Sequence, residues 1–160
     1  MRHTEEGSEE HIKPFYSSGL RFGCVRCSNC CRHAPGYVFL IQKDIERLTY
    51  ATGLDRGTFL YRYCREVNLS GFHRVSLIEK GNYDCVFWEQ DGCTVYRHRP
   101  MQCRSYPFWS GNLVSQRAWE RLKSSCPGIG QGRLHSQREI ERWLRQAESN
   151  RFIASFSEIE

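Results

Sequence analysis

Apolar positions recur at helical spacing in several parts of the chain. Gln42 opens a segment in which Ile45 and Leu48 share one face, and Gly53 supplies the glycine that commonly ends a helix. Further along, Ser115 is a suitable cap for another short helix. The apolar side of that helix consists of Ala118, Trp119 and Leu122.

Two more helices are predicted from their caps and stripes. Asp55 can cap one that ends at Gly71. Its apolar stripe contains Phe59, Leu60, Tyr63, Cys64 and Val67. The other begins at Ser136, which forms a capping-box pattern with Glu139. Its apolar face contains Ile140, Trp143, Leu144 and Ala147.

Between these helices the pattern changes to short strands. Residues 72–78 and 84–88 are predicted to pair across a turn at residues 79–83, where Gly-Asn favours a reversal. The sequence Gln-Asp-Gly at residues 90–92 predicts a second turn, before a short segment at 93–96.

This order of elements predicts an α+β fold: one small domain, mostly helical, with a short β-hairpin and irregular loops. Pro100 is expected to open a helical turn that reaches Cys103. We expect a flexible tail at residues 1–19, a single domain at 20–152 and a C-terminal tail at 153–160.

Composition narrows the function classes. The first 19 residues contain no apolar stretch typical of a signal peptide. The longest apolar run, residues 37–41, is far too short to span a membrane, so we expect a cytoplasmic protein with reduced thiols. The formal charge of +5 makes nucleic acid an unconvincing partner, because metal-bound thiolates would cancel most of it and the arginines are scattered.

Nine cysteines carry the clearest chemical signal. Cys64 lies alone on a predicted buried stripe, where a free cysteine behaves as a small hydrophobe. The other eight form a C-x2-C-x2-C-C run at residues 24–31, followed by three spaced cysteines and a Cys-Pro. Eight thiolates are twice the number that complete a tetrahedral zinc site or hold one iron–sulfur cluster. They are Cys24, Cys27, Cys30, Cys31, Cys85, Cys93, Cys103 and Cys126.

The adjacent pair Cys30 and Cys31 adds a constraint. In extended backbone, neighbouring side chains point to opposite sides, so one ion would not take both thiolates. They would then serve different sites, or different metals of one polynuclear site; alternatively, one of them binds no metal. The C-x2-C-x2-C spacing and the distant Cys126-Pro127 also match the order seen in bacterial ferredoxin loops.

These cysteines, with the Arg-Pro, Tyr-Pro-Phe-Trp and Cys-Pro-Gly-Ile-Gly elements between residues 22 and 132, resemble the YkgJ-like cysteine-cluster family. That family is also named the CxxCxxCC zinc- or iron-chelating domain. The resemblance implies that all eight cysteines are metal ligands and that the cofactor is an iron–sulfur cluster, of the 4Fe-4S type, or zinc. A similar domain occurs in bacterial flagellin lysine methylases, but this chain has no long additional segment for a substrate domain.

Other side chains could contribute to the centre. Arg99 and Arg104 flank Cys103 and could donate hydrogen bonds to thiolate or sulfide sulfur; the alternative is that both are ordinary solvated arginines. His33 and His98 lie beside cysteine segments but are expected at the surface. An apolar wall around the centre is expected from Phe87, Trp88, Tyr106, Phe108 and Trp109.

Two functions follow from this pattern. The first is an iron–sulfur protein with redox or cluster-dependent, methyl-transfer-like chemistry, which leaves open whether the protein is an enzyme. The second is a structural zinc module that acts through an unidentified protein partner. The low hydrophobic content of 39% favours the zinc module, because metals can hold together a small core.

Overall fold

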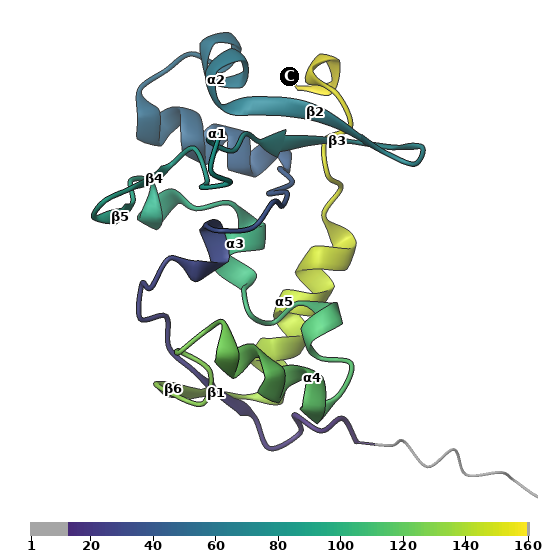
Figure 1. Ribbon diagram of the computed structural model, residues 1–160. Helices are drawn as coiled ribbons and strands as arrows, with labels where there is room; N and C mark the ends of the chain where they lie inside the picture. The colour runs from purple at the N-terminus through teal and green to yellow at the C-terminus, as the bar shows by residue number, and fades with distance from the viewer. Residues whose placement is uncertain (1–12, 160) are drawn as a thin grey trace, which may run out of the picture.

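The computed structural model describes residues 13–159, which form two hydrophobic clusters with the cysteine-rich segments between them (Figure 1). The upper cluster is built from α1 (Gln42–Thr52), α2 (Arg56–Tyr63) and the antiparallel pair β2 (Cys64–Leu69) and β3 (Phe72–Leu77). The lower cluster is built from α4 (Gln116–Arg121), α5 (Gln137–Ser149) and the antiparallel pair β1 (Leu20–Phe22) and β6 (Arg133–His135). The fold is therefore α+β, as predicted.

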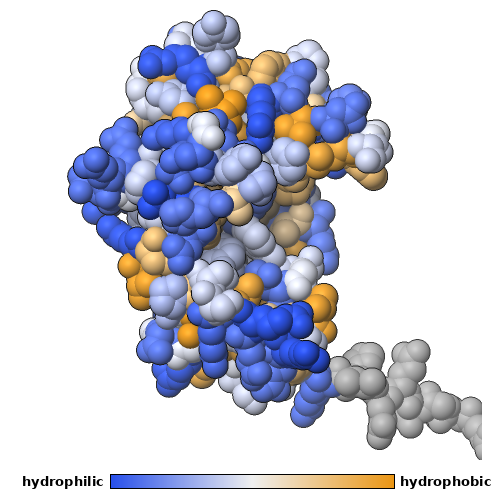
Figure 2. All heavy atoms as spheres, in the orientation of Figure 1, coloured by the Kyte–Doolittle hydropathy of each residue, from blue (hydrophilic) through white to orange (hydrophobic). Residues whose placement is uncertain are grey.

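The intervening segments contain only short elements. They are β4 (Trp88–Glu89), β5 (Gly92–Cys93), α3 (Met101–Ser105) and the 3-10 turns Asn29–Cys31 and Tyr96–His98. No helix within residues 13–159 has the length and apolar character needed to cross a membrane. On the face shown in Figure 2, apolar residues form separate patches among mostly hydrophilic residues.

The predicted helix caps are confirmed. Gly53 follows α1 with φ +66°, a conformation that glycine adopts without steric cost. The Asp55 carboxylate accepts a hydrogen bond from the backbone N–H of Thr58 at the start of α2. Ser136 and Glu139 form a complete capping box on α5. These signals involve residues three or four positions apart, so they act independently of the remaining fold.

The helix predicted to continue through Val67 is wrong, because it ends at Tyr63 and residues 64–69 form β2. Ser70 and Gly71, with φ +50° and +95°, reverse the chain so that β2 pairs with β3. Gly71 therefore belongs to a hairpin turn rather than a helix end. Cys64 is buried as expected, although it lies on a strand.

The predicted strand at residues 84–88 is also largely absent. Cys85 makes a single bridge to Glu79, and the backbone N–H of Trp88 returns to the Cys85 carbonyl at 2.8 Å. This tight turn prevents a straight strand. Only β4 and β5 remain, joined across the predicted Gln-Asp-Gly turn.

Both ends of the described chain pack onto the clusters. Phe15 and Tyr16 contact the lower cluster, while residues 1–12 of the predicted tail lie outside the described residues. After α5, the chain runs back to the upper cluster, where Ile153 is buried. Its N–H donates to Leu40 and its carbonyl accepts from Val75. Residues 153–159 thus add to the core where the sequence predicted a tail.

Candidate metal centre

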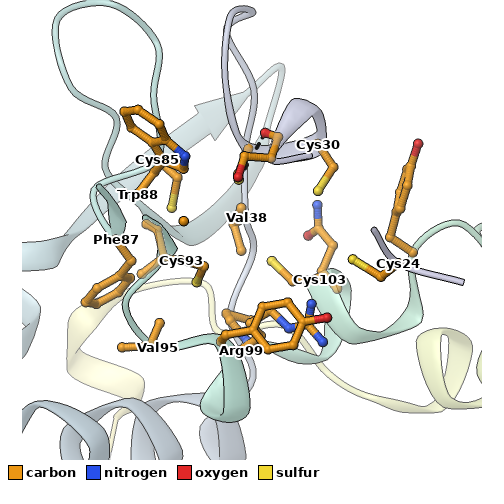
Figure 3. Close-up of a pocket in the computed structure, with 18 of the residues that line it drawn as sticks. Cys24, Cys30, Val38, Cys85, Phe87, Trp88, Cys93, Val95, Arg99 and Cys103 are labelled. Atoms are coloured by element: carbon orange, nitrogen blue, oxygen red, sulfur yellow. Dashed lines mark hydrogen bonds between the residues drawn. The ribbon is translucent and has the colours of Figure 1, made fainter. Parts of the chain in front are cut away.

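A cavity of about 140 Å³ lies between the two clusters. Its wall includes parts of the 24–31 loop, the β4–β5 hairpin and α3. Six of the eight predicted ligands line it: Cys24, Cys30, Cys31, Cys85, Cys93 and Cys103. In Figure 3, Cys24 and Cys30 lie on one side, Cys85 and Cys93 on the other, and Cys103 between them. The 24–31 loop and the segment from Cys85 to Cys103, which are far apart in the sequence, thus present cysteines to one space.

The 24–31 loop turns its thiols inward through unusual backbone angles. Arg26 and Ser28 have φ values of +57° and +64°, which are uncommon for residues other than glycine. The loop ends in a single 3-10 turn, Asn29–Cys31, in which the N–H of Cys31 donates to the Ser28 carbonyl at 3.0 Å. The loop is therefore curled, and Cys24, Cys27 and Cys30 remain accessible to solvent.

The expectation that Cys30 and Cys31 point to opposite sides is wrong, because their backbone is not extended. Consecutive side chains on a 3-10 turn are about 120° apart rather than on opposite sides. Both residues line the same cavity. A hydrogen bond between the two thiols lowers the pKa of Cys30 to about 7. The same bond, together with burial, raises the pKa of Cys31.

The two remaining ligands, Cys27 and Cys126, do not line the cavity. The Tyr106 hydroxyl, which does line it, donates a hydrogen bond to the Cys126 thiol. Burial raises the pKa of Cys126, and the charges of Cys27 and Cys30 act in the same direction. Cys126 is therefore coupled electrostatically to two cysteines of the 24–31 loop.

Backbone amides support several thiolates. Cys85, Cys93 and Cys126 each accept a hydrogen bond from the N–H two residues ahead, on Phe87, Val95 and Gly128 respectively. Burial raises the pKa of Cys85 to about 11, and the amide acts against this effect. Such N–H···S bonds stabilise the negative charge that a metal-bound thiolate retains. No sequence pattern indicated these hydrogen bonds.

Of the two arginines considered from the sequence, Arg99 lines the cavity and Arg104 does not. The Nε of Arg99 is buried and has no hydrogen-bond partner among residues 13–159. Its guanidinium lies 3.5 Å from the centre of the Tyr96 ring, and Arg26 lies 4.3 Å from the same centre. Arg104 instead donates its Nε–H to the Arg99 carbonyl at 3.1 Å. Arg99 thus has a free donor beside the thiols, held in place by Arg104.

The predicted apolar wall is present except for one residue. Phe87, Trp88, Tyr106 and Trp109 line the cavity, whereas Phe108 belongs to the lower cluster. His33 and His98 are not part of the cavity lining.

Two carboxylates that the sequence did not single out fix the ligand segments. Asp84 accepts from the Nε of Arg32 at 3.1 Å, and the Arg32 guanidinium also lies 3.5 Å from the centre of the Trp88 ring. Asp44 is fully buried and accepts from the N–H of Met101 at 2.8 Å, which fixes the start of α3. Arg32 follows Cys31 and Asp84 precedes Cys85 in the sequence. This proximity to cysteines was the only sequence signal for the ion pair.

The donor set suits a thiolate-bound metal. Thiolates, with a free guanidinium donor nearby, match the soft, negatively charged environment of zinc or iron–sulfur sites. Within residues 13–159, no three cysteine, histidine, aspartate or glutamate side chains stand together closely enough to hold a metal ion.

Cys64 is the natural control for these ligands. It is 7% exposed within the upper cluster, and burial raises its pKa to about 12. We expect Cys64→Ala to reduce the free energy of unfolding by about 1 kcal/mol, the usual cost of a methyl-sized cavity. Metal content per chain, measured by elemental analysis, should remain that of the original protein. A loss of metal would show that Cys64 is a ligand.

Comparison with known proteins identifies the family of this chain. The family model CxxCxxCC, described as "Putative zinc- or iron-chelating domain", matches residues 23–127, more than half of the chain. No solved structure matches the fold. The matched range covers all eight candidate ligands and both arginines beside Cys103. The chain belongs to the CxxCxxCC family of zinc- or iron-chelating cysteine-cluster domains.

Proposed function

We propose that this protein holds iron–sulfur centres through its eight clustered cysteines and uses them in redox or cluster-dependent chemistry. The cavity is the observation that carries the proposal. A cavity for one water molecule needs about 10–15 Å³, so a space of about 140 Å³ is roughly ten times larger. Four thiolates around a single ion need no such space, whereas a multi-atom iron–sulfide core does. The size of the cavity therefore favours iron–sulfur over mononuclear zinc.

The residues around the cavity have distinct roles in this proposal. The cysteines bind the metal, and the amides of Phe87, Val95 and Gly128 stabilise the charge on three of them. The free Nε–H of Arg99 would donate to a sulfur of the centre and partly offset its negative charge. The aromatic wall excludes water. When bound, an iron–sulfur centre supplies one-electron transfer, at a potential set by these hydrogen bonds and by solvent access.

Several finer properties belong to the same proposal. All nine cysteines carry free thiols, which suits a reducing compartment such as the cytoplasm. Oxidoreductase or methyl-transfer-like activity would require a redox or protein partner outside this chain. Arg99 is proposed to contact the centre, while Arg104 acts through the Arg99 backbone.

A structural zinc module is the second candidate. The specific observation in its favour is the division of the core into two clusters, with cysteines packed against both. Metal bonds between these cysteines would stabilise a chain with limited apolar burial.

The visible spectrum of protein purified without oxygen separates the two candidates. Air can remove iron from such centres and allow zinc to replace it, so purification in air is not informative. We expect a brown protein whose broad visible absorption bleaches on reduction and returns on reoxidation. Cys103→Ser should lose much of this absorption, and Cys64→Ala should keep it. A colourless, zinc-loaded protein would contradict the iron–sulfur proposal.

A further inference from the structure

Resting on the proposed function, we propose that the eight thiolates form two separate four-thiolate sets, divided between the adjacent residues Cys30 and Cys31. The lower set contains Cys24, Cys27, Cys30 and Cys126. The upper set contains Cys31, Cys85, Cys93 and Cys103. Each set has the four thiolates that complete one zinc site or one iron–sulfur cluster.

The ligand loop, residues 24–31, is attached through Gly23 and Asn29 to the segment that carries Cys126. The N–H of Gly23 donates to the Gly128 carbonyl at 3.2 Å, and the Asn29 side chain donates to the Ser125 carbonyl at 3.0 Å. These bonds hold both ends of residues 23–29 against residues on either side of Cys126. Cys126 itself belongs to the lower cluster.

The last residues of the loop are attached elsewhere. The N–H of Cys85 donates directly to the Cys31 carbonyl at 2.8 Å. Beside this bond, the Arg32–Asp84 ion pair joins the next residue of the loop to the residue before Cys85. The loop therefore changes partners within two positions, between Asn29 and Cys31.

The other two members of the upper set are fixed to the upper cluster. Cys93 lies opposite Trp88 in the β4–β5 pair, and both Cys85 and Cys93 pack against that cluster. Cys103 lies on α3, whose first N–H is held by Asp44 of α1. The neighbouring Gln102 side chain bonds to the backbone of Tyr37 and Phe39 at the edge of the same cluster. α3 is thus anchored on the upper side.

Cys24 completes the lower set. Figure 3 shows it on the side of Cys30, away from Cys85 and Cys93. With Cys27, Cys30 and Cys126-Pro127, it also reproduces the C-x2-C-x2-C and Cys-Pro order noted in the sequence. Because Cys30 and Cys31 are adjacent and both line the cavity, the two proposed centres meet at this pair.

Native mass spectrometry of protein purified without oxygen tests the division by counting bound groups. We expect two groups on the original chain, one on the Cys27→Ser/Cys126→Ser double variant, and one on the Cys85→Ser/Cys93→Ser double variant. Cys64→Ala should keep two. A single group on the original chain would overturn the division, as would loss of both groups in a double variant with the native circular dichroism spectrum.

A second pair of variants keeps all eight thiols and covers the case in which a double variant fails to fold. Asn29→Ala removes the lower attachment to Ser125, and Arg32→Met removes the upper ion pair. We expect metal release to a chelator to occur in two phases, with each variant accelerating a different phase. The acceleration should be roughly five-fold, the factor that corresponds to the loss of one hydrogen bond. Acceleration of the same phase by both variants would overturn the division.

These outcomes are independent of the identity of the metal. The masses of the bound groups distinguish zinc from iron–sulfur and therefore test the proposed function. Their number and their response to each variant test the division. Two zinc ions that are lost separately would contradict the iron–sulfur proposal and support the division into two four-thiolate sets.

Discussion

Gly128→Ala is expected to remove most of the metal bound near Cys126 while the upper set retains its own. A Cβ at this position would lie 2.3 Å from the Gly23 carbonyl oxygen and 3.1 Å from the Phe22 ring. Both neighbours belong to the backbone or the core, so neither can move away cheaply. The ligand loop and the Cys126 segment must separate, at a cost of about 1–3 kcal/mol for such overpacking. Metal content per chain should therefore fall by about half.

Gly111→Ala is the matched control. A Cβ there would have no neighbour within 4 Å, and the residue lies in a 3-10 turn outside the cavity lining. Elemental analysis of both variants, purified in parallel without oxygen, gives the comparison. Equal metal in Gly128→Ala and the original protein would show that the close approach of Gly23 and Gly128 is not needed for binding.

Removal of the metal is expected to lower the melting temperature substantially. The cysteines lie on segments between two hydrophobic clusters. Metal that binds only the folded state stabilises that state by mass action. With free metal at a thousand times its Kd, this effect is about 4 kcal/mol. For a chain of this size each kcal/mol corresponds to about 2–4 °C, so Tm should fall by roughly 10 °C.

Thermal unfolding followed by circular dichroism, with and without a chelator, measures this change. The Cys64→Ala variant should begin from a slightly lower Tm and show the same further loss on chelation. Chelation that empties the centre without changing Tm would indicate that the two clusters are stable independently of the metal.

The sequence predicted the parts of the fold that depend on local chemistry. The caps at Asp55, Ser115 and Ser136 are confirmed because a side-chain oxygen and an N–H three residues later decide them. The strand β2 was missed because Tyr63, Cys64 and Val67 also fit a helical stripe, and only pairing with β3 selects the strand. Propensity over so few residues is easily overridden by tertiary contacts.

Prediction of the candidate site from the sequence was limited in the same way by contacts between distant residues. Cysteine spacing was sufficient to single out the six cysteines that line the cavity, since cysteines gathered at short intervals favour a shared metal site. The orientation of Cys30 and Cys31 was predicted incorrectly, because the 3-10 turn depends on Ser28. The contacts of Arg32 and Asn29 join residues 52 and 96 positions apart, beyond what any local pattern indicates.

The most direct test of the account is the content of iron, acid-labile sulfide and zinc in protein purified entirely without oxygen. We predict iron and sulfide in equal amounts, with little zinc, and loss of both when the cysteines of either set are replaced. Stoichiometric zinc without sulfide would contradict iron–sulfur binding. Protein free of all three would contradict the conclusion that its clustered thiols bind metal.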